Sequence, residues 1–157
     1  MSNQPSARAS QVLMISTYLV SAIGIFVGFI TVFAKEPSLT WAALLTVGCG
    51  GVLSFIRHTL VPRSDGVRMG WESGKLNPFQ LETGAANLAW ALLAFGAVIF
   101  GWGLAVEASS FLVFGLYMLT AAVIQVVMKR KLPIVVASLS FGVAMSVIGI
   151  LGLNAAG

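Results

Sequence analysis

Charged side chains are absent from five long stretches of the chain. These stretches cover residues 12–34, 40–56, 83–106, 108–128 and 132–157. About 20 helical residues cross the ~30 Å hydrocarbon core of a bilayer, and a charge at the centre of such a helix costs roughly 2.5–3.5 kcal/mol. The pattern therefore predicts five membrane-spanning helices, at about 12–34, 39–61, 79–106, 109–128 and 132–153.

The stretches are continuously apolar and lack the alternation of lipid-facing and lumen-facing residues that is typical of a membrane β-barrel. We therefore predict an all-α fold, a bundle of five transmembrane helices that forms one membrane domain over residues 1–157. The connections are short, and the longest covers residues 62–78. Gly24 and Gly28 form a G-x-x-x-G pair, which favours close contact with another helix.

Basic residues gather on one side of the predicted membrane. With five spans, eight of the nine Lys and Arg residues lie on the same side as the N-terminus, and only Lys35 lies opposite. Cytoplasmic segments of membrane proteins are enriched in Lys and Arg. This asymmetry predicts a multi-pass membrane protein with its N-terminus and the connection 62–78 inside and its C-terminus outside.

Composition narrows the chemistry further. Hydrophobic residues make up 58 % of the chain, and the net charge of +4 follows from topology. The charge therefore indicates anionic lipid at the inner face as a partner, and not nucleic acid. One cysteine (Cys49) and one histidine cannot form a disulfide or a multi-ligand metal site within one chain. We predict no metal site, and no motif identifies a cofactor.

The start of the third span carries capping signals. Asn77 can cap the helix, Pro78 suits its first position, and Gln80 stands where a capping box places its second side chain. We expect this helix to continue to about residue 106 and residues 107–110 to form a minimal hairpin.

Polar residues suited to chemistry converge on the region between the second and third spans. The candidate functional surface contains Arg57, His58, Trp71, Phe79, Gln80, Glu82 and Asn87. His58 titrates near physiological pH and Glu82 lies at the membrane edge, so these two are the candidate catalytic residues; a functional Glu82 would pair with Arg57 or His58. Structural roles are the alternatives: snorkelling for Arg57, helix-dipole stabilisation for Glu82 and interhelical hydrogen bonding for Asn87.

The same region carries a recognisable pattern. A histidine closes the second span and is followed by Gly70-Trp71, by Asn77-Pro78-Phe79-Gln80-Leu81-Glu82-Thr83-Gly84 and by Asn87-Leu88. The pattern resembles a family of small uncharacterised bacterial multi-pass membrane proteins with a similar G-W…P-F-Q-x-E-x-G…N-L segment, DoxX-like in size. The resemblance implies a multi-pass protein of the bacterial inner (cytoplasmic) membrane, and it implies no activity and no functional residue.

Three functions fit these observations. The favoured one is a non-enzymatic accessory or structural subunit, or a self-associating helical bundle, because small residues suited to helix contact are abundant and the sequence shows no nucleophile–base pair. Its partners would be other membrane subunits or further copies of the chain. The second is a channel or small-solute carrier formed by an oligomer. The third is a quinone-linked or lipid-interface enzyme that uses His58 and Glu82, by analogy with DoxX-like proteins.

Overall fold

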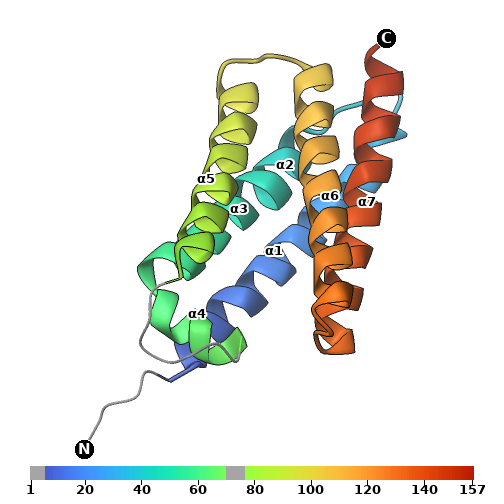
Figure 1. The fold of residues 1–157 in the computed structure, drawn as a ribbon. Coiled ribbons are helices and arrows are strands. Elements are labelled where there is room, and N and C mark those ends of the chain that lie inside the picture. The colour runs from blue at the N-terminus through green and yellow to red at the C-terminus, as the bar shows by residue number, and fades with distance from the viewer. Residues whose placement is uncertain (1–5, 70–76) are drawn as a thin grey trace, which may run out of the picture.

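Helices occupy almost every uncharged stretch of the chain. The computed structural model describes residues 6–69 and 77–157, and these residues form helices and no strand (Figure 1). The elements in chain order are α1 (Arg8–Val32), α2 (Thr40–Ala43), η1 (Leu44–Cys49), α3 (Gly50–Phe55), η2 (Ile56–Leu60), α4 (Pro62–Met69), α5 (Pro78–Ile99), α6 (Leu104–Val127) and α7 (Leu132–Ala156).

Five segments of the described chain are long and apolar enough to cross a membrane. They are Arg8–Val32, Thr40–Leu60, Pro78–Ile99, Leu104–Val127 and Leu132–Ala156, and the second of them joins α2, η1, α3 and η2 in one span. Large apolar side chains cover the outside: Phe26 is 67 % exposed and Val127 is 75 % exposed. Apolar surface of this extent requires lipid or a partner. The predicted all-α bundle of five spans is thus confirmed, and the chain is a multi-pass membrane protein.

The second span is wound partly as a π-helix. Both η1 and η2 are π-helical, a geometry that is rare and is often found at functional sites. Glycine weakens the preference for a regular α-helix, and here it also allows close packing. A Cβ atom on Gly51 would lie 2.7 Å from the carbonyl oxygen of Asn87 on α5. The segment η2 carries Arg57 and His58.

Close backbone contact also joins α6 to α7. A Cβ atom on Gly149 would lie 2.7 Å from the backbone nitrogen of Leu112, and one on Gly115 would lie 2.7 Å from that of Ser146. Helices in lipid associate through such van der Waals contact, since lipid tails are as apolar as the helices themselves. The two helices therefore form a tight antiparallel hairpin, seen at the right of Figure 1.

The helix α1 crosses the bundle obliquely and contacts both the second span and α7 (Figure 1). Gly24 packs against η1, where a Cβ atom would lie 2.8 Å from the backbone nitrogen of Thr46. Gly28 faces α7, where a Cβ atom would lie 3.1 Å from Cδ1 of Ile148. The G-x-x-x-G pair thus makes its helix contacts within one chain.

The third span is shorter than the sequence predicts. We expected it to cover 79–106, but α5 ends at Ile99 and α6 begins at Leu104. Gly101 and Gly103 both have positive φ, of 62° and 88°, a conformation that glycine adopts without steric cost. The chain therefore turns at residues 100–103, and the expected hairpin at 107–110 is wrong, because these residues lie within α6.

Two further boundaries differ from the prediction. The first span begins at Arg8 and not at residue 12, and part of the connection 62–78 is the helix α4. Proline is favoured in the first turn of a helix, so Pro62 ends the second span and also starts α4. The early start of α1 brings Ser10 against α4, where its backbone N–H donates to Oγ of Ser64 at 3.0 Å.

Candidate functional site

One end of the bundle holds the start of α1, the segment η2, the helix α4, the start of α5 and the α6–α7 turn (Figure 1). We call it the basic end. Polar side chains from the first four of these elements meet there. A cap fixes the start of α5 there, as predicted: Oδ1 of Asn77 accepts a hydrogen bond from the backbone N–H of Phe79 at 3.1 Å, and Pro78 occupies the first turn. The side chain of Gln80 does not complete a capping box, because its amide points to α4 instead.

Asp65, on α4, is the centre of this polar group. Its Oδ1 accepts hydrogen bonds from Oγ of Ser10 at 2.6 Å and from Nη2 of Arg68 at 2.8 Å. Its Oδ2 receives Nε2 of Gln80 at 3.0 Å and lies 2.8 Å from Nδ1 of His58. The carboxylate is fully buried, and donors saturate both of its oxygens. We call these five residues together with Arg57 the Asp65 cluster.

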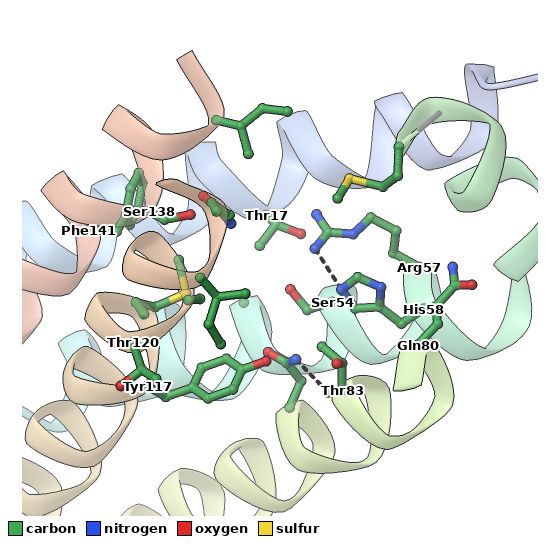
Figure 2. Close-up of a pocket in the computed structure, with 18 of the residues that line it drawn as sticks. Thr17, Ser54, Arg57, His58, Gln80, Thr83, Tyr117, Thr120, Ser138 and Phe141 are labelled. Atoms are coloured by element: carbon green, nitrogen blue, oxygen red, sulfur yellow. Dashed lines mark hydrogen bonds between the residues drawn. The ribbon is translucent and has the colours of Figure 1, made fainter. Parts of the chain in front are cut away.

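The partners of His58 define its protonation state. Its Nε2 lies 3.0 Å from Nη2 of Arg57 (Figure 2). A guanidinium group only donates hydrogen bonds, so Nε2 must accept and carries no proton. The proton therefore resides on Nδ1, where it is donated to Asp65. The geometry describes a neutral imidazole that links Arg57 to the carboxylate.

The charges of the Asp65 cluster do not cancel. Arg57 and Arg68 are cations, Asp65 is the anion and His58 is neutral, so these four residues carry one excess positive charge. Burial alone would raise the pKa of the Asp65 carboxyl, but hydrogen bonds from His58 and Ser10 and the charge of Arg68 hold that pKa well below its ordinary value. The carboxylate is therefore ionised at neutral pH, and the excess charge persists.

Arg57 carries the unmatched part of this charge. Its side chain is 12 % exposed, and its Nε lies 3.8 Å from Oδ1 of Asp65, which is an ion-pair distance and too long for a hydrogen bond. Among the described residues, this buried Nε has no hydrogen-bond partner. Nη1 of Arg57 makes no hydrogen bond in the described chain either, and it is not enclosed as Nε is. Because polar groups away from bulk water are nearly always hydrogen-bonded, the Nη1 side of the guanidinium is where a partner can bind.

A cavity of about 450 Å³ lies between α1, the second span, α5 and the α6–α7 hairpin. The residues that line it are Thr17, Tyr18, Ser21, Gly50, Ser54, Arg57, His58, Arg68, Met69, Asn77, Phe79, Gln80, Thr83, Asn87, Phe114, Tyr117, Met118, Thr120, Ala121, Ile124, Gln125, Met128, Arg130, Ile134, Ser138, Phe141 and Met145. Ligand cavities commonly measure roughly 300–1,000 Å³, so the volume suits a small molecule.

The cavity is polar at one end and largely apolar beyond it. Figure 2 shows the guanidinium of Arg57 reaching into the cavity beside His58, toward Thr17 on α1. Across the space, Tyr117 projects from α6 and Phe141 lies on α7. The surface of the remaining wall is mainly apolar, with methionine, phenylalanine and isoleucine side chains of these two helices among hydroxyl and amide groups such as those of Ser138 and Gln125. Such a cavity matches a molecule with a polar head and an apolar body.

The structure brings three of the predicted site residues together. Arg57, His58 and Gln80 are all members of the Asp65 cluster. Phe79 and Asn87 lie farther along the cavity wall, and Nδ2 of Asn87 donates to the carbonyl oxygen of Thr83, one turn earlier in its own helix, at 2.7 Å.

Of the two remaining predicted site residues, Glu82 lies away from the Asp65 cluster. Glu82 is exposed on α5 and does not line the cavity. In the described chain, the side-chain partners of His58 are Asp65 and Arg57, so His58 and Glu82 do not form the expected acid–base pair. Trp71 lies outside the described residues.

Sequence reasoning missed the centre of the site. Asp65 and Arg68 were visible only as charges in a connection, although their i, i+3 spacing after Pro62 is a helix signal. The interaction of Asp65 with Ser10 spans 55 residues, and no local pattern predicts it. Gly84 is another such position: a Cβ atom there would lie 3.2 Å from that of His58, so glycine allows α5 to approach η2.

Glu107 occupies a different environment at the opposite end of the bundle. Its Oε2 accepts the backbone N–H of Leu39 at 3.2 Å, and its Oε1 accepts Oγ1 of Thr40 at 2.9 Å. These donors belong to the start of α2, where a carboxylate is favoured by the unpaired N–H groups and the helix dipole. Glu107 therefore caps the second span from a neighbouring helix.

No cluster of metal-ligating side chains occurs in the described residues. A family model matches residues 7–129, and its description is a family of unknown function (DUF6790). No curated protein and no solved structure matches the chain.

Proposed function

The chain belongs to the DUF6790 family of unknown function, and we propose that it is a non-enzymatic membrane protein that binds a small amphipathic molecule among its helices. It would act as a carrier or as the binding subunit of a larger assembly. The observation that carries this proposal is the cavity of about 450 Å³, whose charged groups are gathered at the basic end.

The position of the cavity supports an amphipathic ligand. Its wall follows α7 from Ile134 to Met145, eleven positions farther along the helix, which corresponds to roughly 16 Å at 1.5 Å per helical residue. The charged end lies beside α4, which stands outside the candidate spans. A ligand could therefore keep its head near the membrane surface while its apolar part lies among the helices.

A binding role fits the site better than acid–base catalysis. Both ring nitrogens of His58 are engaged by Asp65 and Arg57, and Glu82 is exposed outside the cavity. A general base needs to lie within hydrogen-bond reach of the proton that it abstracts. The polar groups instead hold one another in place around Asp65 and leave donors of Arg57 free, which suits the recognition of a headgroup.

We further propose the bacterial inner membrane as the location, with the basic end in the cytoplasm. The location rests on the resemblance of residues 58–88 to bacterial membrane proteins. The orientation rests on the distribution of basic residues, eight of nine on one side, and on the enrichment of Lys and Arg in cytoplasmic segments. Labelling of the Arg63→Cys variant with a thiol reagent that does not cross the membrane tests this orientation. Labelling from the periplasmic side would reject it.

Native mass spectrometry of the purified protein in a sugar-headed detergent tests the binding function. The probes are saturated twelve-carbon chains ending in a carboxylate, an alcohol or an ammonium group. We expect at least one of them to bind saturably with a stoichiometry of one. Ala121→Phe, which fills the cavity from α6, should abolish the adduct.

A matched control on the same helix is Val123→Phe. Val123 is 63 % exposed and does not line the cavity, so this variant adds aromatic bulk on the lipid-facing side and should keep the adduct. If none of the probes binds, or if both variants bind them equally well, the proposed function is wrong.

A further inference from the structure

The charge arrangement of the cavity specifies the headgroup of the ligand. Building on the proposed binding function, we infer that the ligand is a single-chain amphiphile with an anionic headgroup, held by the guanidinium of Arg57.

The charges around Asp65 are not balanced. The carboxylate of Asp65 faces two guanidinium groups, at 2.8 Å for Arg68 and 3.8 Å for Arg57, and a neutral His58. One positive charge is left without a counter-charge within this group. An isolated buried charge is costly unless it is paired and hydrogen-bonded, so the cavity favours one additional anion.

Arg57 has free donors that a ligand can reach. Of the five N–H donors of a guanidinium, one on Nη2 of Arg57 faces His58, and Nη1 makes no hydrogen bond among the described residues. The Nε is enclosed and takes no part in ligand binding. The group points into the cavity (Figure 2). A planar guanidinium with adjacent free N–H groups matches the two oxygens of a carboxylate or of a phosphate.

The carboxylate of Asp65 is shielded from the cavity. A carboxylate at the mouth of an anion site would repel the ligand, but Asp65 is fully buried and does not line the cavity. Both of its oxygens are occupied by His58, Arg68, Ser10 and Gln80. Asp65 therefore orients the cationic side chains without facing the ligand.

The apolar part of the cavity suits a single acyl chain. Beyond the headgroup position, the cavity continues along Phe114, Phe141 and Met145. Methionine side chains are flexible and adapt to irregular apolar ligands. A volume of about 450 Å³ lies in the lower part of the ~300–1,000 Å³ range of ligand cavities, which favours one acyl chain over the two chains of a bilayer phospholipid.

The test compares headgroups on one chain length at pH 8. Dodecanoate, dodecyl phosphate, dodecanol and dodecylammonium are titrated into the purified protein, and apparent affinities are obtained from the shift in melting temperature. We expect dodecanoate or dodecyl phosphate to bind at least tenfold more tightly than the alcohol and the ammonium. The order of the two anions identifies the source of the headgroup, a fatty acid or a phosphorylated lipid.

Two arginine variants test whether Arg57 holds the headgroup. Arg57→Gln keeps a donor for His58 but removes the charge, and it should weaken anion binding at least tenfold while leaving dodecanol binding unchanged. Arg63→Gln removes the same charge from an exposed position of α4 that does not line the cavity, and it should have no effect. Because the wild-type headgroup preference needs no variant, the inference stays testable even if Arg57→Gln misfolds.

The outcomes separate this inference from the proposed function. Equal affinity for the anions, the alcohol and the ammonium would overturn the anionic headgroup while leaving an amphiphile-binding cavity in place. Tighter binding of the ammonium would overturn it as well. Absence of binding by all four probes would overturn both the inference and the proposed function.

Discussion

Asp65 and Glu107 are buried acids near opposite ends of the bundle, and their surroundings differ in kind. Glu107 is satisfied by a backbone N–H and a hydroxyl group at the start of a helix, which are neutral donors. Asp65 is surrounded by two arginines, a histidine, a serine and a glutamine, and these leave an excess positive charge. Both carboxylate oxygens of Glu107 accept hydrogen bonds from within the fold. The surroundings of Asp65 contain more cationic donors than the carboxylate can pair.

The two acids show that a buried carboxylate can serve the fold alone or can also serve a binding site. A buried acid whose partners are neutral and saturated holds elements together, as Glu107 holds α6 to the start of α2. A buried acid that is outnumbered by cations also prepares those cations for another anion. The test is whether removing each acid affects stability alone, or stability and ligand binding together.

Asp65→Ala should have the largest effect on stability. It leaves Arg57 and Arg68 buried without their carboxylate, and removing one partner of a buried ion pair typically costs about 3–5 kcal/mol. Thermal unfolding of the detergent-solubilised protein measures this loss. Asp65→Asn is the matched control, because it keeps an acceptor for Ser10 and should recover part of the loss; equal stability of Asp65→Ala and wild type would contradict the central role of the cluster.

Acidification should produce a smaller effect of the same origin. The pKa of Asp65 is held below its ordinary value by His58, Ser10 and Arg68, against the opposing effect of burial. A carboxyl with a lowered folded-state pKa contributes stability that is fully present above its unfolded pKa of about 3.9 and is lost as pH falls through the folded value. Melting temperatures between pH 7 and pH 3 should therefore fall more steeply for wild type than for Asp65→Asn.

Most of the fold could be predicted from the sequence. Charge-free length defines the five spans, because hydrocarbon excludes charges from any segment that crosses it. The start of α5 was equally readable, since the cap by Asn77 and the position of Pro78 depend only on neighbouring residues. The orientation of the termini and the resemblance of residues 58–88 remain predictions.

Less of the candidate site could be predicted from the sequence. Arg57, His58 and Gln80 were recognised as polar residues at a membrane boundary, and they meet on Asp65. The role of Gln80 was misread, because a capping box is a local pattern whereas its amide reaches Pro62 and Asp65, 18 and 15 residues earlier. Glu107 was placed in a loop because the turn depends on Gly101 and Gly103 adopting positive φ, and composition does not specify which glycines do so.

Glu107→Ala should cost less than Asp65→Ala. It removes the acceptor of two donors near the start of α2, and leaving a buried donor unsatisfied costs about 1–3 kcal/mol. Glu107→Gln keeps one acceptor oxygen and should cost less. Both variants should bind dodecanoate as wild type does once folded, and a loss of binding in folded Glu107→Gln would remove the distinction between the two acids.

Glu82→Gln should have the smallest effect and provides the reference for both acids. Glu82 is exposed near the start of α5, where a carboxylate gains a modest contribution from the helix dipole, and surface substitutions usually change stability by less than about 0.5 kcal/mol. We expect an unchanged affinity for dodecanoate and a nearly unchanged melting temperature. His58→Gln, measured alongside, removes the link between Arg57 and Asp65 and should weaken dodecanoate binding. If Glu82→Gln instead impaired binding as strongly as His58→Gln, the two residues would act together, and the interfacial enzyme that uses both would replace the binding protein as the better account of this site.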